Sequence, residues 1–308
     1  MVMAYDVLKQ FPVRKNKKQK QSFRDTVESY VQQLGYNCVT EVGSFGVRNL
    51  VIGDPEAASY LITAHYDTCA RMLLPNIVTP CNPVLFLLYQ ILIVGAIVVP
   101  AILVGVLVGL LGKEFAAAAA LTVYWVLLIL MIFGPANPSN VNDNSSGVIT
   151  LLEIMRTLPE NQRSKVCFVL FDMEEAGLLG SAAYRKKHKK ATDQQIVLNL
   201  DCVGDGDHLM LFPTGKLRKD RKKLTAFYKA CGYFGKKSIC IHEKGLHIYP
   251  SDQVNFPYGV AIAAFQKKKY IGLYYSRIHT PRDVILDKTN VNILRAALTT
   301  YICCDAAQ

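Results

Sequence analysis

Six residues carry side chains suited to holding a metal ion, and along the chain they are His65, Asp143, Glu174, Glu175, Asp201 and His279. Two imidazoles and several carboxylates form a mixed nitrogen and oxygen donor set of the kind that binds zinc or a similar divalent ion. If one carboxylate bridges two ions, the pair of ions can activate water for hydrolysis. These residue types therefore predict a hydrolytic metal centre.

The adjacent pair Glu174-Glu175 suits two different roles. Neighbouring side chains point in different directions, so one carboxylate can bind a metal while the other stays free as a general base. A single histidine or a single acidic pair is more often a structural or solvated feature. The prediction therefore depends on whether the fold brings these side chains together.

Each candidate ligand except His279, which lies in a loop, is predicted to come directly after a strand or before a helix. Asp143 lies in the polar loop 140–147, and an apolar run with helical spacing follows at 148–155. His65 follows a strand predicted at 60–64, the glutamate pair follows one at 166–171, and Asp201 follows one at 195–200. In α/β folds, ligands bind at the carboxyl ends of the strands. This shared position predicts a single site.

The alternation of strands and helices predicts an α/β fold with a mixed, mostly parallel central sheet and helices on both faces. Further helices are expected at 22–34, 148–158, 178–188, 216–231 and 291–303, and further strands at 38–42, 47–52, 209–212, 239–242, 260–265 and 270–275. Residues 1–21 form a basic N-terminal segment without the apolar core of a signal peptide.

Two apolar runs, at 84–111 and 116–133, interrupt this pattern between His65 and Asp143. As helices they would be about 42 Å and about 27 Å long, and a bilayer core is about 30 Å thick. Neither shows the polar face of a soluble helix. We therefore expect a transmembrane hairpin at 83–134, inserted into an α/β domain made of 22–82 and 135–308. Gly95, Gly105 and Gly109 would allow close helix packing in this hairpin.

The formal net charge of +11 comes from short basic runs outside the hairpin. The positive-inside rule then predicts an integral membrane protein with its main domain in the cytoplasm. The basic runs suit a solvated surface or an anionic membrane face, and since no aromatic residues are interleaved with them, nucleic acid is not expected as a partner. Nine cysteines without a C-x-x-C pair suit a reducing compartment.

Five motifs occur in order along the chain: His-Tyr-Asp at 65–67, Asn-Asp-Asn-Ser-Ser-Gly at 142–147, Glu-Glu-Ala-Gly-Leu-Leu-Gly-Ser at 174–181, Asn-Leu-Asp at 199–201, and His-Thr-Pro-Arg-Asp at 279–283. With these motifs the chain resembles peptidase family M28, a family of dinuclear zinc peptidases that are mostly aminopeptidases with a phosphorylase/hydrolase-like α/β fold. Ser251-Asp252 is similar to a further loop of many members.

The resemblance implies two zinc ions and a role for each candidate. His65 and Asp201 would bind one zinc, Glu175 and His279 the other, and Asp143 would bridge them. Glu174 would be the general base, and Asp67 would complete the catalytic set by orienting His65.

Two departures from the family pattern stand out. The hairpin separates the first histidine from the bridging aspartate, and loops tolerate insertions when their ends stay close. Ile278 occupies the position where many members have a tyrosine that polarises the scissile carbonyl, so zinc itself, Tyr274 or Tyr275 would have to stabilise the oxyanion.

The leading hypothesis is a membrane-anchored aminopeptidase acting on a peptide or amino-acyl amide. A carboxypeptidase or other amide hydrolase, or a glutaminyl cyclase-like enzyme with a single zinc, would keep the same fold. The alternative without enzymatic activity is a non-catalytic membrane scaffold with the same peptidase fold.

Overall fold

A computed structural model describes residues 4–72, 74, 76–230, 233–234 and 237–304. The strands are β1 Cys38–Val42, β2 Arg48–Ile52, β3 Tyr60–His65, β4 Val166–Phe171, β5 Ile196–Leu200, β6 His208–Pro213, β7 Tyr233–Phe234, β8 Lys237–Ile241, β9 Gly259–Lys268 and β10 Gly272–Tyr274. The helices are α1 Asp6–Gln10, α2 Lys17–Gln33, α3 Pro83–Gly109, α4 Lys113–Phe133, α5 Gly147–Thr157, α6 Leu179–Lys187, α7 Lys189–Thr192, α8 Gly215–Lys219, α9 Arg221–Ala230 and α10 Lys288–Cys304.

The sheet has the strand order β1-β2-β4-β3-β5-β9-β6-β8-β7, and β10 pairs with β9. The central strands β4, β3, β5 and β9 run parallel, while β1, β2 and β6 extend the sheet with antiparallel pairs. The α/β fold with a mixed sheet is therefore confirmed. The helix expected at 216–231 is divided into α8 and α9 at Asp220, and α2 begins five residues earlier than expected.

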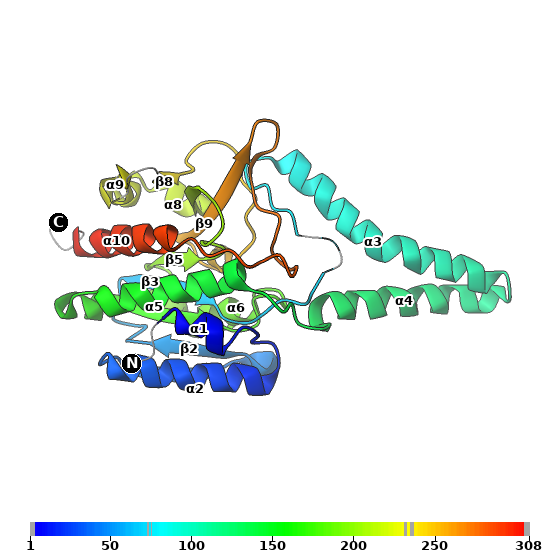
Figure 1. Ribbon diagram of the computed structural model, residues 1–308, viewed down its shortest axis with the longest axis horizontal. Coiled ribbons are helices and arrows are strands. Elements are labelled where there is room, and N and C mark those ends of the chain that lie inside the picture. Colours follow the sequence, from blue (N-terminus) through cyan, green and yellow to red (C-terminus); the bar gives the residue numbers. More distant parts are fainter. Residues whose placement is uncertain (1–3, 73, 75, 231–232, 235–236, 305–308) are drawn as a thin grey trace.

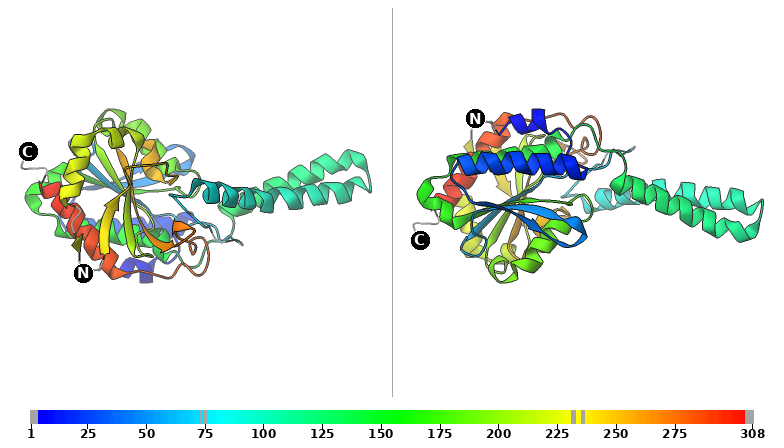
Figure 2. Two further views of the ribbon diagram at one scale, coloured as in Figure 1. Left: turned by 90° about the horizontal axis from the view of Figure 1, so that it is seen from above. Right: turned by 90° about the horizontal axis from the view of Figure 1, so that it is seen from below.

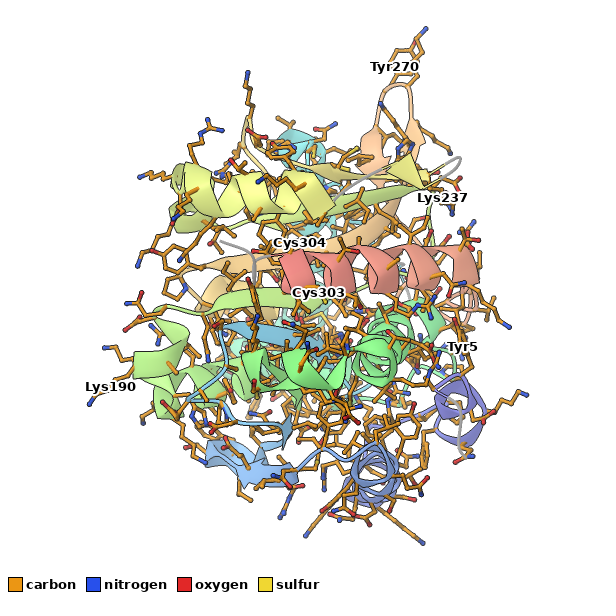
Figure 3. The ribbon with its side chains drawn as sticks, turned by 90° about the vertical axis from the view of Figure 1, so that its left-hand side faces the viewer. Tyr5, Lys190, Lys237, Tyr270, Cys303 and Cys304 are labelled. Carbon is orange, nitrogen blue, oxygen red and sulfur yellow. The ribbon has the colours of Figure 1, made fainter. Side chains whose placement is uncertain are left out.

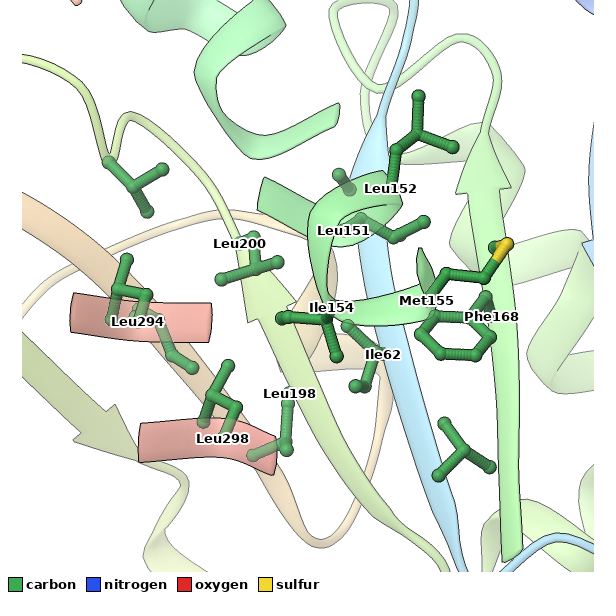
Figure 4. Close-up of a cluster of buried hydrophobic side chains, with 14 of the residues drawn as sticks. Ile62, Leu151, Leu152, Ile154, Met155, Phe168, Leu198, Leu200, Leu294 and Leu298 are labelled. Carbon is green, nitrogen blue, oxygen red and sulfur yellow. The ribbon is translucent and has the colours of Figure 1, made fainter. Parts of the chain in front are cut away.

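Helices cover both faces of the sheet because the strands bury side chains on both sides (Figure 1). On one face, Ile62 and Leu198 pack in a cluster with residues of α2, α5, α9 and α10. Figure 4 shows part of this cluster, including Ile154 of α5, Ile62 and Leu198 of the strands, and Leu294 of α10. On the other face, Leu61 and Val197 pack with Tyr184 of α6. Burial on both faces of the sheet explains why these strands appear in the sequence as continuous apolar runs.

The expected basic N-terminal segment packs against the α/β domain. Arg14 is fully buried, and its Nε donates to the carbonyl oxygen of Tyr66 at 2.5 Å. Arg24 Nη1 donates to the Tyr66 hydroxyl at 2.6 Å. An N-cap at Asn16, with Gln19 completing a capping box, starts α2 directly after this anchor. The N-terminal residues therefore support the residues that follow β3.

Helices α3 and α4 form a hairpin that projects away from the α/β domain (Figures 1 and 2). Both are long and apolar enough to cross a membrane, and the domain buries little or none of their surface. They approach closely near the tip, where a Cβ atom at Gly105 would lie 2.8 Å from Ala120 Cβ and one at Gly109 would lie 3.1 Å from Ala116 Cβ. Gly95 has open space around it. Close packing at glycine thus holds for two of the three expected positions.

The side of the domain away from the hairpin carries the end of α10, with Cys303 and Cys304, and the basic residue Lys190 (Figure 3). Tyr270 lies at the tip of the β9–β10 hairpin, and its side chain is 85% exposed. Since Lys190 lies far from the apolar helices, this part of the basic surplus is solvated surface.

Candidate metal centre

The candidate ligands come together at one edge of the sheet. His65 is the last residue of β3, and the segments that leave the neighbouring parallel strands β4 and β5 carry Glu174, Glu175 and Asp201. Asp143 lies in the non-helical part of the turn Val141–Ser146 that leads into α5, and His279 lies in the loop between β10 and α10. The sheet thus gathers side chains that are more than 200 residues apart in sequence.

Asp143 lies between the two histidines. Its Oδ1 atom is 3.1 Å from His65 Nε2, and its Oδ2 atom is 3.1 Å from His279 Nε2. Asp201 Oδ1 is 3.8 Å from His65 Nε2, and Glu175 Oε2 is 3.4 Å from His279 Nε2. Each oxygen of Asp143 therefore faces a different histidine and its accompanying carboxylate.

The donor atoms fit divalent metal ions. His65, Asp143 and Asp201 each offer a ligand atom within 4.8 Å of the others, and so do His65, Glu174 and Glu175. A third group joins Glu175 and His279 with the buried thiol Cys69, which sequence reasoning had not included. Glu175 Oε1 is buried and has no hydrogen-bond partner among the described residues. Several buried carboxylates beside two imidazoles need positive charge, which zinc would supply.

The electrostatics of the protein groups alone show the same need. Burial raises the pKa of Glu174 well above its usual value and that of Glu175 to about 8, with repulsion from neighbouring carboxylates adding to it. Burial lowers the pKa of His279, but Glu175 and Asp143 outweigh it and raise the value to about 9. Burial alone would raise the pKa of Asp143, but the two histidines outweigh this effect and hold the pKa far below its usual range. Without a metal ion, protons on these glutamates and histidines supply the positive charge that a bound cation would otherwise supply.

Asp67 contacts both His65 and the loop that carries the two glutamates. Its Oδ1 atom lies 3.5 Å from His65 Nδ1 and accepts from the backbone N–H of Glu174 at 3.1 Å. Its Oδ2 atom accepts from the N–H of Glu175 at 3.3 Å. Asp67 therefore lies beside the first histidine and also holds the loop of the two glutamates, a second contact that the sequence did not predict.

Asp283 and two asparagines support the backbone around Asp143. The carboxylate of Asp283 accepts from the N–H of Asn142 at 2.7 Å and of Asp143 at 3.0 Å. Asn142 Oδ1 accepts from the N–H groups of Gly204 and Asp205, and Asn144 Nδ2 donates to the carbonyl of Leu200. All three side chains are buried. Their signal in the sequence was polar residues concentrated in two motifs, but nothing there separated ligands from supports.

The backbone is strained next to three of the candidate ligands. His279 itself has a φ of 60°, Met173 before the glutamate pair has 57°, and Cys202 after Asp201 has 58°. Residues other than glycine rarely adopt this left-handed backbone conformation, and those that do are concentrated at functional sites. The surrounding packing therefore holds these loops in the geometry that points the carboxylates and imidazole inward.

A cavity of about 280 Å³ contains the constellation. Its walls include Tyr275, Ile278 and, from the hairpin, Phe86 and Gln90 of α3. The Tyr275 hydroxyl lies 3.3 Å from that of Tyr249, whereas Tyr274 donates to Gln266 at 3.0 Å and does not line this cavity. Of the two tyrosines named from the sequence, Tyr275 is the one beside the site.

A second cavity, of about 430 Å³, reaches Asp67 and Glu175 from the side of α2. Lys15 lines it and donates from Nζ to the carbonyl of Ile132 near the end of α4, at 2.9 Å. The pKa of Lys15 is lowered by burial, against the attraction of Glu175. The N-terminal segment thus brings a cation close to the carboxylates and ties itself to the hairpin.

Comparison with protein families finds one match, to the model described as Peptidase family M28, over residues 131–301. This is 171 of 308 residues, and it includes all the candidate ligands except His65. No curated protein sequence matches the chain.

Solved structures share the whole fold at low sequence identity. The glutaminyl cyclase of Porphyromonas gingivalis is 17% identical, with a TM-score of 0.58 over 98% of this chain and 97% of that one. The LapA aminopeptidase of Legionella pneumophila is 14% identical, with a TM-score of 0.60 over 99% and 71%. A Zn-dependent exopeptidase from Parabacteroides distasonis is 17% identical, with a TM-score of 0.56 over 97% and 95%. At such identities the likeness establishes the fold alone.

Proposed function

Because the chain belongs to peptidase family M28, we propose that it is a zinc-dependent hydrolase. Specifically, we propose a membrane-anchored aminopeptidase with two zinc ions. The observation that carries the proposal is the position of Asp143, whose two carboxylate oxygens each lie 3.1 Å from a different histidine. A carboxylate so arranged suits two cations a short distance apart, and such pairs occur in aminopeptidases.

The residues divide into two ligand sets around Asp143. His65 and Asp201 would hold the first zinc, Glu175 and His279 would hold the second, and Asp143 would be shared between them. The distances of 3.8 Å from His65 Nε2 to Asp201 Oδ1 and of 3.4 Å from His279 Nε2 to Glu175 Oε2 support this division. Asp67 fixes the ring of His65, and Asp283 holds the backbone of Asp143.

Zinc in this site would lower the pKa of a coordinated water and polarise the scissile carbonyl. Glu174 accepts a proton from the attacking water and delivers it to the leaving amine. Its position in the cavity, with a carboxylate oxygen close to His65 and Glu175, supports this role. With Ile278 at the usual tyrosine position, the Tyr275 hydroxyl in the cavity wall is the protein group suited to the developing oxyanion.

The hairpin α3–α4 crosses the membrane twice and returns the chain to the same side. Both helices have the required length and apolar composition, and the domain leaves their side chains uncovered. Of the 35 Lys and Arg residues of the chain, all except Lys113 at the tip of the hairpin lie in the segments on the domain side, which favours a cytoplasmic domain.

The test is zinc content together with hydrolysis of leucine amide, for the detergent-purified protein and for Asp143→Ala. We expect about two zinc ions per chain, with activity lost on chelation and in the variant. Asp207→Ala, at a side chain that is 81% exposed, is the matched control and should keep both properties. A single tightly bound zinc would favour a glutaminyl cyclase-like reaction, and neither zinc nor activity would leave a non-catalytic membrane protein.

A further inference from the structure

An apolar cavity separates α3 and α4 at the end of the hairpin nearest the domain. Its volume is about 410 Å³, and its walls include Met72, Ile93, Ala96, Ile97, Leu127 and Leu130. Nearer the tip the helices meet tightly at Gly105 and Gly109, so the space between them is closed at that end. We call this cavity the interhelical gap.

The interhelical gap and the metal-site cavity lie along the same face of α3. This face carries, at helical spacings of four, three and four residues, Phe86, Gln90, Ile93 and Ile97. The first two line the cavity that contains the candidate ligands, and the last two line the gap. A molecule lying along this face of α3 would reach from the metal site into the gap.

Met72 forms the boundary between the two spaces. It lines the gap, its Sδ atom is 3.3 Å from Nδ1 of the candidate ligand His279, and its backbone N–H donates to the His279 carbonyl at 2.9 Å. Unbranched methionine side chains adapt readily to irregular apolar ligands. Arg71, also in the wall of the gap, is exposed and suits the head-group level of a bilayer.

We propose that the interhelical gap binds the alkyl chain of an amphiphilic substrate whose scissile amide lies at the metal site. The substrate class is an amino-acyl amide or short peptide with a long aliphatic chain on its leaving-amine side. The chain belongs on that side because the free α-amine of an aminopeptidase substrate is charged, and burying it among aliphatic side chains would be costly. This inference rests on the proposed function.

The reaction is an ordinary hydrolysis. The amide C–N bond breaks, the water oxygen joins the acyl carbon, and the alkylamine leaves with the proton that Glu174 took from the water. The products are a free amino acid and an alkylamine, which stays in the membrane. No oxidant, reductant or further reactant is needed.

The experiment measures kcat/KM for leucine N-alkylamides with ethyl, butyl, hexyl and octyl chains, using the full-length protein in lipid nanodiscs. Each methylene moved from water into an apolar site gains up to about fourfold in binding, so we expect at least tenfold between the ethyl and hexyl amides. Ala96→Trp fills the gap and should abolish this preference. Ile102→Trp adds the same indole to a lipid-exposed position on α3 outside the gap, and should keep it.

Rates that do not depend on chain length, or equal effects of the two tryptophans, would overturn the inference while leaving the peptidase intact. If even the ethyl amide is not hydrolysed, the proposed function has failed, and binding decides the matter. A leucine amide with a photoreactive diazirine on its alkyl chain should then label residues 93–97 and 127–131 preferentially. Uniform labelling of the hairpin would overturn the inference.

Discussion

The substitution Asp283→Asn tests whether the site depends on a residue that binds no metal. Asp283 is 1% exposed, and its two carboxylate oxygens accept from the backbone N–H groups of Asn142 and Asp143. Asparagine has nearly the same shape but only one acceptor oxygen. One of the two N–H groups would then face an amide NH₂ group instead of an oxygen, and the turn that presents Asp143 would loosen.

The magnitude follows from these two hydrogen bonds. A bond to a charged acceptor contributes about 1.5–3 kcal/mol, and a buried donor left without a partner costs about 1–3 kcal/mol. Losing one bond and weakening the other should therefore destabilise the fold by about 2–4 kcal/mol. In a domain of this size that is a melting temperature lower by on the order of 10 °C. Support residues of this kind also change metal affinity by about 10–100-fold.

The assays are thermal unfolding and competitive zinc titration at pH 8, because burial and the neighbouring Asp143 raise the pKa of Asp283 to about 7. Asp207→Asn, at an 81% exposed carboxylate beside Lys237, is the control and should change stability by less than about 1 kcal/mol. If Asp283→Asn binds zinc as the wild type does and melts at the same temperature, the backbone contacts do not support the site and the reasoning is wrong.

Three further results are expected. Glu174→Gln should lower kcat for leucine amide by about 10²–10⁴-fold and keep the zinc content, since the general base is lost and the ligands stay; unchanged kcat would remove Glu174 from the mechanism. Without zinc, His279 holds a proton at pH 7 because its pKa is about 9. Zinc binding should therefore release protons at pH 7, and zinc affinity should fall as the pH falls. Calorimetry in buffers of different ionisation enthalpy would measure the number of protons released. Gly105→Val should destabilise the hairpin by about 1–3 kcal/mol in a proteolysis assay, because its Cβ would lie 2.8 Å from that of Ala120, whereas Gly95→Val meets open space; equal protease sensitivity of the two variants would contradict this packing.

The sequence predicted the elements whose patterns are local and strong. The strand at 166–171 was predicted with the bounds of β4, because an apolar run of six residues has the length of a buried strand and is too short for a typical buried helix. Five of the candidate ligands could be named because each follows a strand or precedes a helix, whereas His279 was named from its motif at 279–283. Asp283 and Lys15 had no assigned role, since their function depends on contacts with residues 53 or more positions away. The left-handed backbone at His279 likewise depends on the assembled loops.

The position of the hairpin explains how a long insertion can coexist with a site that needs both of its flanks. The two flanking segments are joined before the helices begin: Ala70 and Ala136 form a β-bridge, the N–H of Arg71 donates to the Pro135 carbonyl, and that of Asn137 donates to Cys69. The chain thus leaves and re-enters the domain at one point, and the loop-closure cost does not fall on the ligands. Because the same joint carries Met72 to His279, the insertion brings its apolar helices to the mouth of the site.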